Sequence, residues 1–548
     1  MFRKNRAHHQ ATLLDSTLWM DPGIRDKLAK SWAPIFYEHV FCQIDEQPFS
    51  VLYSNTGAPN FPVNILVSLE YIKHIRDCND LELVDSFHFD YLVNYALGIR
   101  TLGELNLADR TLYNFRQRVY QYSQEHPGGD DLLFGQFLRL LEGFVRVAGV
   151  HLEEQRTDTT MFMSNIKKAG RISLAFDVLT STVSAIPEAL RPETLQRLLE
   201  PAFRTDVLYR SRSQDGDTRL AKLLNLCREA VALLETLPAK KGVAAAIAVA
   251  RRFLEEQSVV DAETGGLSAR NKKEIPSGSL QSAYDADATY RHKGEVRQSG
   301  YVLSLAETCD TDNPIQLLTD YAVAPNNVND AEILSGRLPM IKQTTGCTDL
   351  YADGGYHSEG VNGVAAEHGV NIHLTDMTGT EPSTKMPVTA FDIDPTSKRI
   401  LQCPAGHTPV HAGVGKNQTS AHFPTNACST CPLRSTCHSR PQRKDWVVRI
   451  NLKAIRNAAI REEIHKDRKE NTSKRAAIES ANAALKRKGL RKLPVRNRIR
   501  CSVYCAYKVT AQNIKRIVRY CQGEKSGRTS RRAPSVSTIQ GIIIPICG

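Results

Sequence analysis

The stretch LYADGGYHS, residues 350–358, decides the fold, because an apolar run ends there at Asp353 and two glycines follow. A short apolar run bounded by a turn signal is typical of a buried strand. The same texture recurs in YVLSLAETC, IQLLTDYAVA and VNIHLT, which occupy residues 301–309, 315–324 and 370–375. Residues 151–165, HLEEQRTDTTMFMSN, also interleave Thr, Met and Phe with polar residues as a strand does. The sequence therefore predicts an α/β unit whose strands come from distant segments.

Segments with other residue patterns flank and separate these predicted strands. Residues 1–147 have helical apolar spacing and predict an all-α N-terminal domain, followed by a catalytic domain at 148–520. Leu/Ala periodicity within residues 165–280 predicts a helical insertion, and residues 400–440 form a cysteine-rich insertion. Residues 521–548 are basic and rich in Ser, Arg and Gly, which predicts a disordered tail.

Length and composition exclude several classes of protein. With 548 residues and 41% apolar content, the chain has ample material for a core and is too long for one ordinary domain. No apolar run approaches the ~20 residues that span a bilayer, so no membrane association is expected. Thirteen cysteines are far from the density of a secreted disulfide scaffold. We expect a reducing compartment, the cytoplasm.

The net charge of +12 is concentrated at one end of the chain. Residues 441–548 contain 27 Lys and Arg against 7 Asp and Glu, which leaves the preceding 440 residues at −8. A basic excess of this kind indicates a polyanionic partner, most simply nucleic acid. The alternative is a basic tail that only aids solubility or contacts RNA loosely.

Three carboxylates stand out by their context. Asp158 lies between the hydroxyls of Thr157 and Thr159 in the first strand, Asp353 ends a strand, and Glu479 lies within a predicted helix. Mg²⁺ prefers oxygen ligands, and two such ions bridged by carboxylates can activate water and stabilise a leaving oxygen in phosphodiester hydrolysis. Three converging acids would hold two ions of this type.

The helix around Glu479 has a polar face. Asn471 is expected to cap its N-terminus, and Gly489 to lie just past its end. At about 100° per residue, Thr472, Arg475 and Lys486 project from the same face as Glu479. This face either looks into a site or is a solvated face with an ordinary Arg–Glu pair, worth about 0.3–0.5 kcal/mol.

Four motifs in order resemble the DDE transposases of bacterial insertion sequences, specifically the IS1182-type group within the broad IS4/IS5-like set. RTDTTMFMSNIKKAGRISLAFDVL at residues 156–179 resembles the first-Asp motif, and YDADATYRHKGEVRQSGY at 284–301 resembles the approach to the second strand. LYADGGYHS resembles the second-Asp motif. The third motif, Y-x2-R-x3-E-x6-K, maps to residues 472–486 with threonine in place of tyrosine.

The resemblance implies a fold, a reaction and its residues. The implied fold is RNase H-like, a mixed five-stranded sheet with helices on both faces, and the implied catalytic acids are Asp158, Asp353 and Glu479, which would bind Mg²⁺ or Mn²⁺. Double-stranded DNA, as terminal inverted repeats and target, is the implied partner of a homodimer in the bacterial cytoplasm, associated with the nucleoid. The implied reaction cuts the element ends with water and joins their 3′-hydroxyls to target DNA.

Two sets of cations are candidate DNA contacts. Near Glu479, phosphate contacts are expected from the basic residues of its helix face and the segment that follows, namely Arg475, Lys486, Arg487, Lys488, Arg491 and Lys492. In the N-terminal region, DRTLYNFRQRV at residues 109–119 predicts a helix with Arg110, Arg116 and Arg118, as in a helix-turn-helix contact. The alternative for that helix is an ordinary bundle helix with a solvated face.

The cysteine-rich stretch predicts a structural zinc site. Cys428, Cys431 and Cys437 form C-x2-C-x5-C, and Cys403 begins CPAGH upstream. Four thiolates around one tetrahedral Zn²⁺ are a common structural site. His407 or His438 is an alternative fourth ligand, and four free cytosolic thiols are the other interpretation.

The sequence leaves three functions open. The chain is an active transposase, a catalytically inactive sequence-specific DNA-binding protein, or a metal-dependent nuclease without strand transfer. The three intact carboxylates favour the first of these functions over the second.

Overall fold

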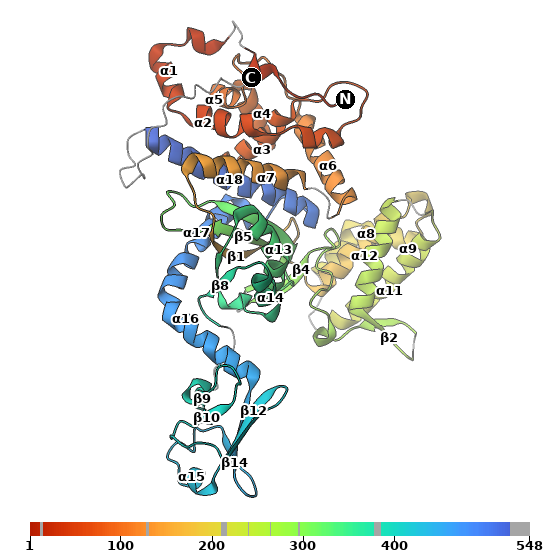
Figure 1. Ribbon diagram of the computed structural model, residues 1–548. Helices are drawn as coiled ribbons and strands as arrows, with labels where there is room; N and C mark the ends of the chain where they lie inside the picture. The colour runs from red at the N-terminus through yellow and green to blue at the C-terminus, as the bar shows by residue number, and fades with distance from the viewer. Residues whose placement is uncertain are drawn as a thin grey trace.

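The structure is a computed structural model that describes residues 1–10, 15–127, 131–209, 216–238, 241–263, 265–293, 296–377 and 385–525. A central body of sheet and helices has a helical insertion on one side (Figure 1). A small β-rich module lies apart from this body, at the far end of one long helix (Figure 1).

A mixed six-stranded sheet forms the centre of the molecule. Its strands are β1 (Glu154–Phe162), β4 (Thr289–Lys293), β5 (Val296–Thr308), β6 (Leu318–Pro325), β7 (Asp349–Ala352) and β8 (Asn371–Leu374). Five of them lie in the order β6-β5-β1-β7-β8, with β5 antiparallel to β1 and β6, and with β7 and β8 parallel to β1 and to each other. The predicted mixed α/β class is confirmed, but the strand count of five was wrong, because β4 forms a hairpin with the first half of β5.

The sheet is continuous in space although its first two long strands are far apart in sequence. β1 pairs with β5 from Gln155↔Thr308 to Phe162↔Tyr301, so the strand of Asp158 is directly hydrogen-bonded to the segment 301–308. Gly300 makes the close approach feasible, because a Cβ there would lie 2.3 Å from the carbonyl oxygen of Phe162.

The insertion between β1 and β4 folds around a core of its own. It consists of α8 (Arg171–Ala185), α9 (Glu193–Gln196), α10 (Pro201–Leu208), α11 (Gly216–Glu235), α12 (Lys241–Gln257), β2 (Ser258–Val260) and β3 (Leu267–Ala269). Leu179, Leu224 and Phe253 are among the residues buried there, and this core is separate from that of the sheet.

The N-terminal helices share one hydrophobic core with the sheet and the C-terminal helix. They are α1 (Pro22–Ala29), α2 (Trp32–His39), α3 (Val63–Arg76), α4 (Asp80–Phe89), α5 (Tyr91–Ala96), α6 (Asp109–Glu125) and α7 (Leu132–Ala148). The ring of Tyr71 on α3 lies 5.9 Å from that of Tyr507 on α18 (Arg498–Lys525), and Phe137 on α7 lies 5.1 Å from Tyr321 on β6. Residue 147 is therefore not a boundary between two cores.

The second half of the chain returns to the sheet through the module. α13 (Asp330–Thr345) and α14 (Glu359–Glu367) flank β7, and the module contains β9 (Asp392–Ile393), β10 (Ile400–Gln402), β11 (His411–Val414), β12 (Gln418–Phe423), α15 (Thr425–Ser429), β13 (Ser439–Pro441) and β14 (Trp446–Asn451). From β14 the chain continues through α16 (Leu452–Ala476), α17 (Ile478–Leu485), a kinked segment (Lys486–Leu490) whose backbone is non-helical at Lys488 and Gly489, and α18. Short 3₁₀ helices lie at Ala7–His9, Ser16–Trp19, Phe41–Gln43, Gln47–Leu52, Glu188–Leu190, Arg197–Leu199, Lys272–Glu274, Gly354–Tyr356 and Val388–Ala390.

The helix around Glu479 differs from the prediction at its start. Asn471 lies inside α16 and donates to the carbonyl oxygen of Leu374 at 3.1 Å, so its amide serves strand β8 and the predicted N-cap was wrong. Asn451 caps α16, and the helix breaks at Ala477. Gly489 has φ +81, as expected for a residue that ends a helix.

α18 ends only at Lys525, so the predicted disordered tail begins too early at 521, and residues 526–548 lie outside the described residues. Among the described residues, no helix combines the length and apolar character needed to cross a membrane.

Candidate active site

The two aspartates come together through the register of two parallel strands. β1 and β7 pair at Arg156↔Tyr351, so Asp158 and Asp353 each lie two residues beyond that pair. Alternation along a strand places residues two apart on the same face. The two carboxylates therefore belong to one edge of neighbouring strands, although 195 residues separate them in sequence.

The glycines after Asp353 hold its carboxylate in place. Asp353 caps the short turn Gly354–Tyr356, and its Oδ1 accepts a hydrogen bond from the Gly355 N–H at 2.8 Å. A Cβ on Gly354 would lie 2.7 Å from the carbonyl oxygen of Asp376, so the neighbouring loop can approach only a glycine. Oδ2 of Asp353 is left to face the site.

Arg475 lies at the centre of the three acids. Its Nη2 is 3.3 Å from Oδ1 of Asp158 and 3.7 Å from Oδ2 of Asp353, and its Nη1 is 2.8 Å from Oε1 of Glu479. The Arg475 and Asp158 side chains are 17% and 14% exposed, whereas Glu479 is 62% exposed at the rim. The structure thus brings the three predicted carboxylates around one guanidinium, and their catalytic role stays a prediction.

The structure adds a polar residue that the sequence reasoning did not single out. Asn482 follows Glu479 by one helical turn, and its Nδ2 donates to Oδ2 of Asp158 at 3.0 Å. Its Oδ1 is buried without a hydrogen-bond partner. The i, i+3 spacing from Glu479 was the available signal for this residue.

Three hydrogen bonds fix the end of α16 against β1 and β7. Arg156 Nη1 donates to the carbonyl oxygen of Lys474 at 2.9 Å, and Lys474 Nζ donates to Oε2 of Glu154 at 2.8 Å and to Tyr351 Oη at 3.1 Å. Burial acts to lower the pKa of Lys474, but the hydrogen bonds to Glu154 and Tyr351 outweigh it and raise the pKa. A lysine held charged between these strands places Arg475 over the sheet edge.

A buried tyrosine lies behind the carboxylates. Burial raises the pKa of Tyr356 well above its usual value, and the neighbouring carboxylates Asp158, Asp330 and Asp353 raise it further. Its hydroxyl therefore stays protonated and adds no negative charge beside the two aspartates.

The donor set suits a hard cation, but it is not arranged as a metal site as it stands. Asp158, Asp353, Glu479 and the unpartnered Oδ1 of Asn482 offer only oxygen, the ligand type that Mg²⁺ and Mn²⁺ take. Within the part of the chain that the structure describes, no group of three or more His, Cys, Asp or Glu is placed to hold a metal ion. Arg475 occupies the centre of the carboxylates, so a cation there would take over its contacts.

The basic residues after Glu479 lie on the turn that leaves the site. Arg487, Arg491 and Lys492 are exposed, and Lys486 and Lys488 are half-buried. The segment is bonded to the end of β1, because the Met163 N–H donates to the Arg491 carbonyl oxygen at 3.1 Å. This connection keeps the cations beside the strand of Asp158.

The three N-terminal arginines are placed differently from one another. Arg110 is exposed at the start of α6, and Arg118 is exposed with its guanidinium 4.8 Å from the centre of the Tyr53 ring. Arg116 instead pairs with Glu70 at 2.6 Å and with Asp80 at 2.7 Å. Its guanidinium joins α6 to α3 and α4, and the DNA-contacting role of Arg116 stays a prediction.

The three cysteines of the C-x2-C-x5-C stretch and the upstream Cys403 line one pocket of the module. Cys403, Cys428, Cys431 and Cys437 surround it with His407. Burial raises the pKa of Cys428 to about 11, and the other three thiols contribute to the rise. The Nε2–H of His438 donates to the carbonyl oxygen of Met386 at 2.9 Å, so His438 is the poorer of the two alternative ligands.

Residues 402–518 match the family model of a transposase DDE domain. The match begins in the module, includes Arg475 and Glu479, and ends in α18, whereas Asp158 and Asp353 lie outside it. No curated protein and no solved structure matches the chain.

A transposase DDE domain indicates a phosphoryl-transfer enzyme with DNA as its partner, and such enzymes generally use divalent metal ions. The six-stranded mixed sheet is consistent with the RNase H-like fold of that domain.

Proposed function

We propose that this protein is a DNA transposase that binds the ends of an insertion sequence, hydrolyses phosphodiester bonds there and joins the 3′-hydroxyl ends to target DNA. The observation that carries the proposal is the meeting of Asp158, Asp353 and Glu479 on Arg475. These groups come from β1, the end of β7 and α17, three elements distant in sequence. The finer assignment to the IS1182-type group and the homodimer on DNA belong to the same proposal.

The residues of the site have separate roles in this proposal. Asp158, Asp353 and Glu479 would hold two Mg²⁺ or Mn²⁺ ions, which when bound supply an activated water and charge stabilisation for the leaving oxygen. Arg475 moves from the carboxylates to the phosphate of the scissile strand. Asn482 keeps Asp158 oriented, and Lys474 keeps the end of α16 on β1.

The test is incubation of the purified chain with the DNA that flanks its gene, in buffer with Mg²⁺ and a supercoiled plasmid as target. The proposal expects strand breaks at a fixed position and covalent joining of the 3′ ends to the plasmid. Breaks without joining would identify a nuclease, and specific binding with neither product would identify a catalytically inactive DNA-binding protein.

The basic turn should contribute phosphate contacts that carry no sequence information. We expect Lys492→Gln to reduce the slope of log K against log salt by about 1 and to weaken binding to end DNA and random DNA alike. Fluorescence anisotropy over a salt series measures this slope. Lys222→Gln, an exposed lysine of α11 in the insertion, is the control and should leave the slope unchanged.

In this proposal, Arg110 and Arg118 recognise the base sequence of the element ends. We expect the double change to alanine to reduce the preference for end DNA over random DNA by ~1–3 kcal/mol per lost base contact. Point substitutions are the right tool, because deletion of residues 1–147 would remove part of a core shared with α18. An unchanged preference would place the reading surface elsewhere.

We also propose that the four cysteines bind one structural Zn²⁺. Elemental analysis should find about one zinc per chain, and the Cys428→Ser/Cys431→Ser variant should lose it. Zinc binding should strengthen as pH rises, because the thiols must release protons and the pKa of Cys428 lies above its usual value. Cys78→Ser, in the N-terminal region, should retain the metal. A zinc-free protein in which all four thiols react with an alkylating agent would remove the site.

A further inference from the structure

The small sheet of the module has one apolar face and one basic face. Val448, Ile450 and Phe423 point into the module core. Side chains alternate along each strand, so Arg440 and Arg449 lie on the opposite face. In the row of Arg440, Val447 is buried and His422 pairs with Asp445 at 2.8 Å. Arg440 and Arg449 are both exposed on that face.

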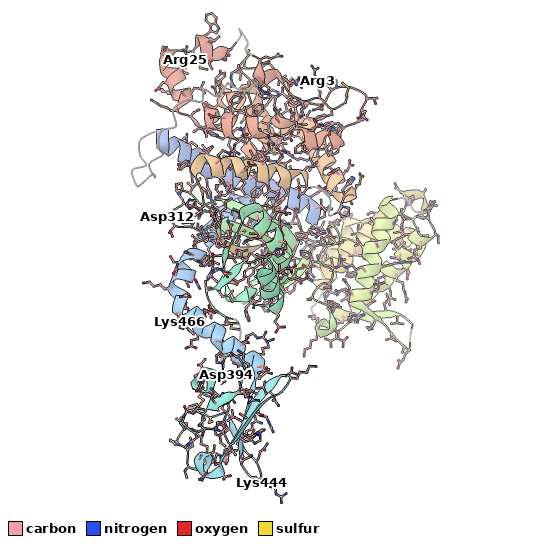
Figure 2. All side chains as sticks on the ribbon, in the orientation of Figure 1. Arg3, Arg25, Asp312, Asp394, Lys444 and Lys466 are labelled. Atoms are coloured by element: carbon pink, nitrogen blue, oxygen red, sulfur yellow. The ribbon has the colours of Figure 1, made fainter. Side chains whose placement is uncertain are left out.

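Further cations extend this basic face at the ends of the strands. Lys416 is exposed in the turn between β11 and β12, and Arg443 and Lys444 are exposed between β13 and β14. Figure 2 shows Lys444 at the end of the module that is farthest from the central body. Residues 386–451 contain eight Lys and Arg against three Asp and Glu, so the module as a whole is positive.

The helix that carries the module is also basic and has a defined length. α16 contains eight Lys and Arg against four Asp and Glu, and Lys466 projects from it into solvent (Figure 2). Between Asn451, where β14 ends, and Arg475, at the carboxylates, 24 residues of helix rise about 36 Å. One turn of B-DNA rises about 34–36 Å.

We infer that the basic face of the module is a second DNA-binding surface, which contacts the same duplex about one helical turn away from the scissile phosphate. A duplex held at the carboxylates and running along α16 presents the same groove to the module after one turn. A paired β-ribbon fits the major groove, and Arg440 and Arg449 would face its phosphates and edges. The inference rests on the proposed function, because it takes the carboxylates as the point where the duplex is held.

The occupant is duplex DNA and not a second copy of this chain. The exposed side chains of the surface are mainly cationic, and the chain carries a net charge of +12, so two such faces would repel each other. Duplex DNA is a polyanion with a regular helical repeat, so it matches both the positive charge of this surface and the length of α16.

The test combines a salt series with a footprint. Arg440→Gln and Arg449→Gln should each lower the slope of log K against log salt by about 1 on a random 40-base-pair duplex, and the double variant by about 2. Lys222→Gln removes the same charge at an exposed position of the insertion, and it should leave this slope unchanged. Hydroxyl-radical footprinting on the gene-flanking DNA, in buffer without added Mg²⁺ so that no strand is cut and the zinc is retained, should show protection about one turn from the cleavage position. The double variant should lose this protection.

The outcomes separate this inference from the proposed function. If the parent chain binds the duplex and both arginine variants keep its slope and footprint, the inference is overturned and the proposed function stands. If the parent chain binds no duplex at all, the proposed function itself fails. If the variants keep the slope but change the sedimentation coefficient, a second copy occupies the face and the inference is again overturned. Circular dichroism and zinc content of each variant report that the module is folded.

Discussion

Asp353→Asn is expected to abolish metal-dependent DNA cleavage, with a loss of more than about a thousandfold, while DNA affinity stays close to that of the parent chain. The amide removes one negative oxygen from the cluster but keeps an acceptor for the Gly355 N–H, which Oδ1 now accepts at 2.8 Å. The turn after β7 should therefore keep its shape. Cleavage of labelled end DNA under single-turnover conditions measures the loss, and anisotropy measures the affinity.

Asp376→Asn is the matched control for this prediction. Asp376 is exposed, and its backbone lies against Gly354, so the control changes the same charge in the same loop environment without touching the carboxylate cluster. It should cut DNA at nearly the parent rate. Retained cleavage by Asp353→Asn would remove Asp353 from the catalytic set, and equal losses in both variants would point to a general charge effect.

The sequence could predict those parts of the site that depend only on residues close together in the chain. Asp353 follows from an apolar run that ends in two glycines, and the helical spacing places Arg475 beside Glu479, with which it pairs at 2.8 Å. The sequence could not show that the same guanidinium also faces Asp158 and Asp353. Those contacts depend on the register of β1 with β7 and on the docking of α16, which no spacing within one segment encodes.

Asn471 and Arg116 show why a pattern within one segment does not fix the partners of a side chain, because a polar side chain can satisfy its hydrogen bonds in more than one way. Asn471 fits the pattern of an N-cap, yet β8 offers it the carbonyl oxygen of Leu374. Arg116 fits the pattern of an exposed DNA contact, yet Glu70 and Asp80 approach it from two other helices. In each case the partner that decides the outcome is distant in sequence.

In the N-terminal region, too, contacts with distant segments decide the structure, here the extent of a domain. Helical spacing predicts its helices, but it cannot say what their apolar faces cover. α7 buries Leu133, Phe137 and Phe144 along one face, and α18 supplies much of the opposing surface from the other end of the chain. A boundary placed at residue 147 from the residue pattern alone therefore divides a hydrophobic core that the N-terminal helices share with the sheet and α18.

The second large effect should come from a buried ion pair behind the site. Glu307 on β5 is 1% exposed and pairs with Arg156 at 2.5 Å and with Arg516 at 2.6 Å. Arg156→Met keeps the length of the side chain but leaves the buried carboxylate with only one cation. Removing one partner of a buried pair typically costs 3–5 kcal/mol, and since Arg516 remains we expect about 3 kcal/mol of unfolding free energy. Urea unfolding followed by tryptophan fluorescence and by circular dichroism measures the shift of the first transition.

Arg146→Met tests whether burial is the cause. Arg146 pairs with Glu142 at 2.9 Å, but both side chains are 74% exposed, so its loss should cost less than about 1 kcal/mol. If the two variants are equally stable, the Glu307 carboxylate must reach water or a proton in a way that its burial does not suggest. If Arg156→Met alone is destabilised, its cleavage rate should also fall, because Arg156 holds the Lys474 carbonyl oxygen and thereby the helix end from which Arg475 reaches Asp158. Adding Glu307→Gln to Arg156→Met removes the buried charge and should recover part of the stability but not the cleavage rate, which separates the cost of an unpaired carboxylate from the loss of the link between β1 and α16.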